Sequence, residues 1–223
     1  MNAALIWDHL ALVLSALILA VGVGVPLGLL AYLFPRFGKA ILWVVDLIQT
    51  VPALALLGII MVVMDPGSPT AVIGLTLYSL LPIVRNTSLG LSQVPDHLKE
   101  AATGMGMSRA YRLLHVEVPL AVPMLVTGIR IAAVNAIGTA VFASFVGGGG
   151  LGGLFYTAIR QENMGMIFLG TLVLMVMAFV LDAGLSYVEH RLSSHSRKKL
   201  PTPVKAIGST VLTVAGVALV ISM

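Results

Sequence analysis

The sequence predicts an all-α membrane protein, a bundle of helices that cross the bilayer several times. Of its 223 residues, 58% are hydrophobic and only 10% are charged, whereas a soluble domain carries about 25% charged residues. The mean hydropathy is +1.03. Six apolar segments are each close to or above the roughly 20 residues that a helix needs to cross a bilayer core. They lie near residues 5–33, 40–64, 70–91, 119–145, 164–188 and 205–222.

The first five segments form the expected core, and the sixth is the shortest. We therefore divide the chain into a transmembrane domain at 1–190, a basic linker at 191–204 and an extra C-terminal transmembrane helix at 205–223. The first apolar stretch lacks a basic leader and is long enough to span the bilayer. We expect it to be a membrane helix and not a cleavable signal peptide.

Basic residues predict which loops face the cytoplasm, because short cytoplasmic loops of membrane proteins are enriched in Lys and Arg. Most of them lie in loops on one side of the predicted bundle. The N-terminus is therefore expected outside, and the loop at 92–118 and the segment at 190–204 in the cytoplasm of a bacterial cell. Placed this way, the net charge of +4 indicates membrane topology and not binding to nucleic acid. The basic residues concerned are Arg36, Lys39, Lys99, Arg109, Arg112, Arg191, Arg197, Lys198, Lys199 and Lys205.

A polar, basic stretch connects the third and fourth segments and reads EAATGMGMSRAYRLLHVEVP from Glu100 to Pro119. It is too long for a tight turn and is patterned like two short helices. Gly104 and Gly106 should end the first of them, because glycine adopts backbone angles that terminate a helix. Pro119 suits the first turn of the next membrane helix, where its missing N–H group has no partner to lose.

Both short helices have candidate N-cap residues. Asp96, which follows Pro95, is the expected cap of the first helix. Ser108 is the expected cap of the second, which should run from Arg109 to about His115. An ordinary basic cytoplasmic loop would satisfy the same charge rule without binding any partner, so this alternative stays open.

The same stretch resembles the EAA loop of ABC-importer permeases, which reads Glu-Ala-Ala, three residues, Gly, nine residues and then aliphatic-x-aliphatic-Pro. In that family the loop is a coupling helix that docks in a cleft of a cytoplasmic ATPase. The resemblance implies this role for the loop at 92–118. The matching residues are Glu100, Ala101, Ala102, Gly106, Val116, Val118 and Pro119, of which Glu100, Ala101, Ala102, Gly106 and Pro119 are our candidate ATPase-coupling residues.

Three further strings are similar to motifs of osmoprotectant permeases, which import glycine betaine, carnitine or choline. Gln49–Leu57 is similar to their QT-[IV]-P-[SA]-LALL motif, Leu80–Thr87 to LLPI-[LV]-RNT, and Ala143–Gly153 to ASF-[IV]-GxGGLG. The four strings occur in the order of that family and cover about residues 40–190. The resemblance implies the five-helix core of a type I ABC importer, with a fold like that of the methionine importers, here followed by a sixth helix.

The resemblance also implies a transport subunit and not an enzyme, with ATP hydrolysis carried out by a partner. The implied partners are a cytoplasmic ABC ATPase, an external substrate-binding protein, membrane lipid and a second permease, either another copy or a paralogue. No cofactor, metal or nucleic acid is expected, and the sequence holds no nucleotide-binding motif and no cysteine. Two alternatives remain: an ABC permease for another amino-acid-like substrate, such as methionine or ergothioneine, and an ATP-independent secondary transporter.

Five polar residues within or beside the apolar segments, and one proline, are our candidates for the translocation path, although neighbouring helices can satisfy such polar groups without any role in transport. The glycine run from Gly147 to Gly153 is expected to form either a flexible external turn or a re-entrant bend where helices pack closely. The path candidates are Gln49, Thr50, Pro52, Asn86, Asn135 and Ser144.

Three charged residues form a candidate cluster inside the bilayer. Asp46, Arg85 and Asp182 each lie roughly 9 Å from the cytoplasmic end of their segments, counted at about 1.5 Å per residue. Because an unpaired charge there costs several kcal/mol, we expect Arg85 to contact Asp46 or Asp182. Arg130 lies deeper. We expect it to have a structural role, such as bonding carbonyls freed by a kink, because a bare Arg would repel a cationic substrate.

Overall fold

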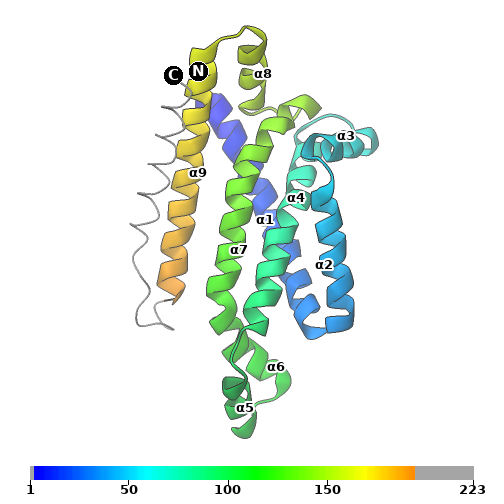
Figure 1. Cartoon of the computed structure of the whole chain (residues 1–223), viewed down its shortest axis with the longest axis vertical. Helices are drawn as coiled ribbons and strands as arrows, with labels where there is room; N and C mark the ends of the chain where they lie inside the picture. The colour runs from blue at the N-terminus through cyan, green and yellow to red at the C-terminus, as the bar shows by residue number, and fades with distance from the viewer. Residues whose placement is uncertain (1–2, 194–223) are drawn as a thin grey trace, which may run out of the picture. The chain divides into compact units, whose positions relative to one another are not determined.

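In the computed structural model, the described part of the chain, residues 3–193, consists of helices and short connections (Figure 1). Four helical stretches are long and apolar enough to cross a membrane, and a bent pair of helices makes a fifth, in agreement with the predicted five-segment core. The sixth helix and nearly all of the linker lie outside the described residues. The elements are α1 (Ala3–Leu33), α2 (Pro35–Thr50), α3 (Ala53–Met64), α4 (Ser68–Ser92), α5 (Asp96–Gly104), α6 (Arg109–Arg112), a π-helical turn (Leu113–Glu117), α7 (Val118–Thr139), a 3₁₀ helix (Ala140–Val146), α8 (Gly152–Arg160) and α9 (Met164–Ser193).

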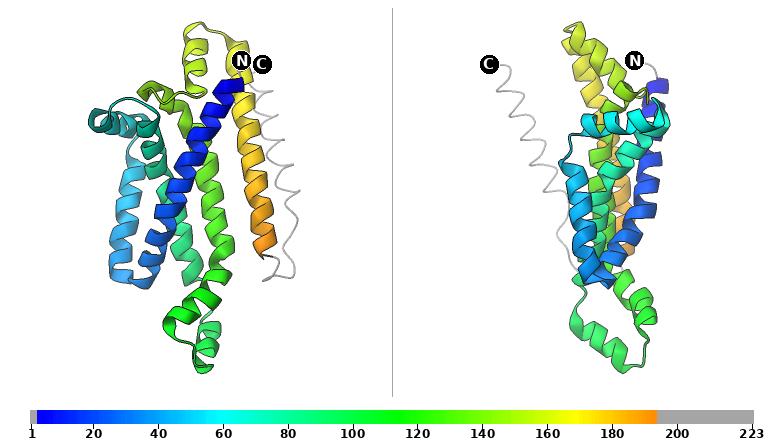
Figure 2. Two further views of the ribbon diagram at one scale, coloured as in Figure 1. Left: turned by 180° about the vertical axis from the view of Figure 1, so that it is seen from behind. Right: turned by 90° about the vertical axis from the view of Figure 1, so that its right-hand side faces the viewer.

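The helices α1, α4 and α7 pack against one another and form the core of the bundle (Figures 1 and 2). Glycines at the crossings let the helix backbones approach closely, as small residues do in membrane bundles. A Cβ atom added at Gly28 would lie 2.8 Å from the carbonyl oxygen of Val84, and one added at Gly128 would lie 2.7 Å from that of Pro82. Such close approach leaves these three helices little freedom to move independently of one another.

The second apolar segment is broken into two helices, which differs from the single span expected at 40–64. The axes of α2 and α3 meet at an angle of 99°, because Pro52 cannot donate the hydrogen bond that would continue α2. The Tyr78 hydroxyl donates a hydrogen bond of 2.6 Å to the carbonyl of Val51, and the Gln49 amide donates one of 3.4 Å to the carbonyl of Tyr78. The polar residues of this segment therefore hold the bend against α4.

The glycine run forms a closely packed bend, so the structure supports the second of the two expected conformations. After the 3₁₀ helix, three glycines adopt positive φ values of 77°, 79° and 81°. Between them, Gly148 lies so close to α4 that an added Cβ would be 2.6 Å from the Cβ of Ala71. The chain then forms α8, a helix that the sequence analysis did not predict.

His9 on α1 ties this bend to the bundle. Its side chain is fully buried, and its Nε2 lies 3.0 Å from the carbonyl oxygen of Ile137 on α7. The backbone N–H of Leu151 donates to its Nδ1 at 3.3 Å, which indicates the tautomer with the proton on Nε2. His9 could not be singled out from the sequence, because a single histidine in an apolar helix belongs to no recognisable motif.

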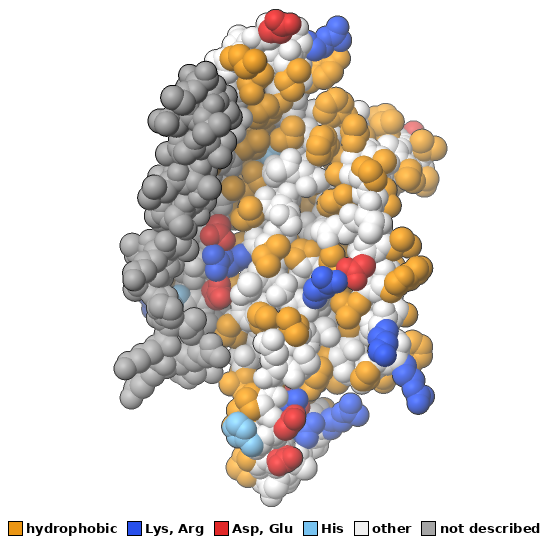
Figure 3. Space-filling view, viewed as in Figure 1, with side chains coloured by type: hydrophobic (Ala, Val, Ile, Leu, Met, Phe, Trp, Pro, Cys, Tyr) orange, Lys and Arg blue, Asp and Glu red, His pale blue; other side chains and the backbone are white. Residues whose placement is uncertain are grey.

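The charges inside the bundle form two separate groups, seen in Figure 3 as red and blue patches among apolar side chains. Arg85 Nη2 donates to both carboxylate oxygens of Asp46 at 2.7 and 3.0 Å, which confirms the prediction that Arg85 contacts either Asp46 or Asp182. Asp182 belongs to the other group, so the predicted cluster of three is wrong. The reason is that α9 presents Asp182 to Arg130 of α7, which donates to it through Nε and Nη2 at 2.9 and 3.0 Å.

Arg130 also bonds a second carboxylate on α9. Its Nη1 donates to Glu189 at 2.6 Å, and the hydroxyl of Thr127 donates to the other Glu189 oxygen at 3.2 Å. Bidentate bonds between guanidinium and carboxylate groups are among the strongest in proteins. The arrangement supports the structural role expected for Arg130, with carboxylates in place of backbone carbonyls as its partners.

Replacing Arg130 with Met should destabilise the protein, because Asp182 would lose its two bonds from Arg130 and Glu189 would keep only the bond from the Thr127 hydroxyl. We expect the free energy of unfolding to fall by about 3 kcal/mol, measured as a lower melting temperature of the purified protein in detergent. The triple variant Arg130→Met/Asp182→Asn/Glu189→Gln removes all three charges and should recover most of the loss. A normal melting temperature for Arg130→Met together with lost transport would contradict this structural role.

Candidate functional site

The connection between α4 and α7 projects beyond one end of the bundle and carries α5 and α6 (Figures 1 and 2). Of the predicted ATPase-coupling residues, Glu100 and Ala101 are exposed on α5, whereas Ala102 is buried. Pro119 is exposed in the first turn of α7, where the sequence predicts it. Basic side chains gather around this end of the bundle (Figure 3). The loop therefore presents an accessible polar helix to whatever lies below the bundle.

Gly106 determines how α5 ends. Its φ of +82° lies in the left-handed region that favours glycine. The N–H groups of Gly106 and Met107 donate to the carbonyls of Thr103 and Ala102 at 2.9 and 3.1 Å, which are the two bonds of a Schellman motif. No atom lies within 4 Å of a Cβ added at Gly106, so the need for glycine here is conformational and not steric. The predicted end of the first short helix is thus confirmed.

The two predicted N-caps have different outcomes. The Ser108 side chain accepts a hydrogen bond of 3.3 Å from the N–H of Tyr111, which confirms it as the cap of α6. Asp96 is not a cap, because the extended backbone of Pro95 already occupies that position and Asp96 is the first helical residue. There its carboxylate favours the positive end of the helix dipole and pairs with Lys99 at 3.3 Å.

The second short helix was predicted to end near His115. It continues instead through the π-helical turn into α7. Within this turn the N–H of Val118 donates to the carbonyl of Leu113, five residues before it. Residues five apart in an α-helix point about 140° away from each other, since each residue turns the helix by about 100°. The wider π turn brings such residues towards one face. It thereby places Arg112 against Glu117.

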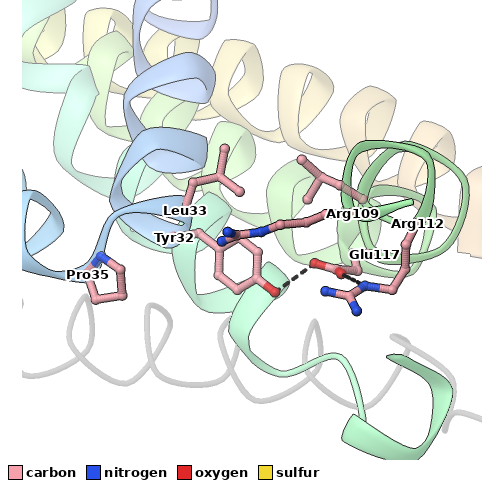
Figure 4. Close-up of a pocket in the computed structure, with 7 residues that line it drawn as sticks. Tyr32, Leu33, Pro35, Arg109, Arg112 and Glu117 are labelled. Atoms are coloured by element: carbon pink, nitrogen blue, oxygen red, sulfur yellow. Dashed lines mark hydrogen bonds and ion pairs between the residues drawn. The ribbon is translucent and has the colours of Figure 1, made fainter. Parts of the chain in front are cut away.

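Glu117 lies at the centre of a polar network between the loop and the bundle (Figure 4). Its side chain is only 2% exposed. One carboxylate oxygen accepts from Arg112 Nε at 2.7 Å, and the other accepts from the Tyr32 hydroxyl at the end of α1, also at 2.7 Å. Arg112 Nη1 donates in turn to the hydroxyl of Thr103 on α5 at 2.8 Å. Because a buried carboxylate is costly without partners, these bonds fix α1, α5 and the π turn relative to one another.

This network was not predicted from the sequence, because Tyr32 and Glu117 are 85 positions apart and neither has a role in the motifs identified above. The available signal was Glu117 itself, a single acidic residue in the aliphatic run before Pro119. A cavity of about 190 Å³ lies beside the network, with Arg109 also in its wall (Figure 4).

The six candidates for the translocation path do not gather in one place. Three of them lie at the bend between α2 and α3. Of the other three, Asn86 and Ser144 donate hydrogen bonds to carbonyls of their own helices. The sixth is exposed on α7 beside a hollow of about 360 Å³ that Arg130 and Asp182 also line. A role in the path therefore stays a prediction for all six. They are Gln49, Thr50 and Pro52 at the bend, Asn86 and Ser144 with bonds of 2.7 and 3.2 Å, and Asn135 beside the hollow.

The fold is similar to that of a solved transporter. A chain from the MetNI methionine ABC transporter, solved in inward-facing conformations, superposes with a TM-score of 0.76 and covers 83% of this chain and 93% of its own length. The two sequences are 21% identical, so this likeness shows the fold alone.

Curated relatives are similar in sequence over most of their length. The carnitine transport permease protein OpuCB of Listeria monocytogenes is 37% identical over 187 residues, which cover 84% of this chain and 86% of the relative. The choline transport system permease protein OpuBB of Bacillus subtilis is 36% identical over 194 residues, covering 87% and 89%. The osmoprotectant import permease protein OsmY of Salmonella typhimurium is 38% identical over 190 residues, covering 84% and 80%.

A family model described as the binding-protein-dependent transport system inner membrane component matches residues 20–194. This match includes the projecting loop, the bend at Pro52 and the glycine bend. Because the model spans most of the chain, and the relatives above share more than a third of the aligned residues, this chain belongs to the family of inner-membrane components of binding-protein-dependent transport systems.

Proposed function

We propose that this chain is the permease subunit of an ATP-driven importer for an osmoprotectant such as glycine betaine, carnitine or choline. The observation that carries the proposal is the projecting loop, in which Glu100 and Ala101 are exposed and Gly106 fixes the end of α5. This is the arrangement that a docking ATPase needs. The substrate class is supported by the three curated relatives, whose names specify carnitine, choline and osmoprotectants.

The proposed assembly contains a cytoplasmic ABC ATPase, an external substrate-binding protein and a second permease, either another copy or a paralogue. The pair of Arg85 and Asp46 supports the second permease, because these side chains are 55% and 42% exposed within a membrane-spanning region. Charged groups at such depth avoid lipid and face a protein partner or a water-filled path. The basic side chains around the projecting loop support its placement in the cytoplasm, with the N-terminus outside.

In the proposed mechanism, nucleotide binding closes two ATPase subunits and pushes on α5 and α6 of each permease. Because α1, α4 and α7 are closely packed, each bundle responds by rocking as a unit, and the path between the two bundles opens to the other side of the membrane. The permease itself carries out no chemical step. The substrate is selected outside, by the binding protein.

Uptake into proteoliposomes tests the proposal. With the ATPase and the binding protein present, we expect ATP-dependent accumulation of at least one of glycine betaine, carnitine and choline, and none when ATP or the ATPase is omitted. Accumulation driven by an ion gradient without the ATPase would show a secondary transporter instead. Accumulation of methionine or ergothioneine alone would retain the ATP-driven class but reject the osmoprotectant substrate.

Replacing Gly106 with Ala should impair the docking of the ATPase. An L-residue in the left-handed region costs about 1 kcal/mol, so the Schellman end of α5 would be weakened without any steric clash. Gly104→Ala is the matched control, because Gly104 is equally open but has no positive φ. We expect a several-fold loss of ATPase retained in a pull-down for Gly106→Ala and none for Gly104→Ala. Equal retention by the two variants would be evidence against this role of the loop.

A further inference from the structure

We propose that Glu117 is a positioning residue that passes movement of the projecting loop to α1, through the hydrogen bond that it accepts from Tyr32. This inference rests on the proposed function, since it concerns how an ATPase docked on the loop would drive transport. The chain of contacts consists of four side chains: Thr103 on α5, Arg112, Glu117 in the π turn, and Tyr32 on α1.

Each hydrogen bond in this network of four side chains is short. Thr103 Oγ1 accepts from Arg112 Nη1 at 2.8 Å, and the two bonds to the Glu117 carboxylate are both 2.7 Å. The network therefore crosses from the tip of the loop to the bundle without a gap. Since the carboxylate is 2% exposed, separating it from either partner would cost free energy. Loop and bundle are therefore expected to move together.

The hydrogen bond from the Tyr32 hydroxyl is the part of this network that reaches α1. The cavity of about 190 Å³ lies beside the Tyr32 ring, so the ring is not closely packed on that side (Figure 4). The ammonium group of Lys99 on α5 lies 5.9 Å from the ring centre, which adds a weaker contact between α5 and α1. The position of the loop relative to α1 is therefore held mainly by the hydroxyl bond and not by packing of the ring.

The helix α1 can carry such movement to the other end of the bundle. Between Tyr32 and His9 it runs for about 35 Å at 1.5 Å per residue. At its far end, His9 contacts the carbonyl of Ile137 and the N–H of Leu151 in the glycine bend. One continuous helix thus has a polar contact with the loop at one end and with the glycine bend at the other.

The decisive variant is Tyr32→Phe, which removes one hydroxyl and keeps the ring. In the reconstituted complex with its ATPase and binding protein, we expect the number of ATP molecules hydrolysed per substrate imported to rise roughly fivefold, because one buried carboxylate oxygen loses its partner. The ATPase should remain bound, since the exposed surface of α5 is unchanged. Tyr187→Phe is the matched control, because its hydroxyl accepts from Arg191 of the same helix, α9, at an exposed position.

A second variant separates transmission of movement from a general loss of structure. Thr103→Val removes the hydroxyl at the other end of the same network. If both residues act through this network, the double variant should raise the number of ATP molecules hydrolysed per substrate imported no further than the larger of the two single effects. The melting temperatures of both variants should stay within a few degrees of the wild type.

Three results would overturn the inference. Tyr32→Phe could leave the number of ATP molecules hydrolysed per substrate imported unchanged, or the two substitutions could multiply their effects in the double variant. The number could also rise only in variants whose melting temperature falls by a large amount. These differ from failure of the proposed function. That failure would appear as a wild-type permease that retains no ATPase, and it would remove the basis of this inference as well.

Discussion

The buried carboxylate of Glu117 is the constraint on which the loop end of this protein depends. A charge that is 2% exposed requires partners for both of its oxygens. One partner, Arg112, lies five residues earlier, so the chain adopts a π turn that brings the two onto one face. The other, Tyr32, comes from the end of α1. The loop between α4 and α7 is therefore held by side chains of the bundle as well as by its own two connections.

The bundle above the loop is built to move as one body. Glycines let α1, α4 and α7 approach until their backbones are nearly in contact. Arg130 on α7 also forms ion pairs with Asp182 and Glu189 on α9. Further irregular parts lie at the opposite end, where α3 leaves α2 at 99° and the glycine bend folds against α4. A rigid centre with special backbone conformations at its ends suits a protein that must change which side of the membrane it opens to.

The sequence predicted features that depend on local patterns and missed those that depend on distant pairs. Apolar runs gave the spans, and glycine conformation gave the end of α5 at Gly106, because both follow from neighbouring residues. Arg85 was predicted to contact Asp46 or Asp182 and it contacts Asp46, yet Asp182 was wrongly placed in the same cluster. The reason is that residue counts along a helix fix depth and not the direction in which a side chain points. The contacts of His9 and Glu117 join residues 128 and 85 positions apart, which no local pattern can reveal.

The central claim is that a cytoplasmic ATPase binds the projecting loop, and cross-linking from a single cysteine tests it most directly. The chain contains no cysteine, so Met105→Cys at the end of α5, where the side chain is 70% exposed, gives one defined attachment point. Met164→Cys, at the start of α9 and 71% exposed, is the control at the opposite end of the bundle. We predict a cross-link to the ATPase from position 105 and none from position 164. A cross-link from 164 alone, or labelling of position 105 by a membrane-impermeant reagent in intact cells, would contradict the account.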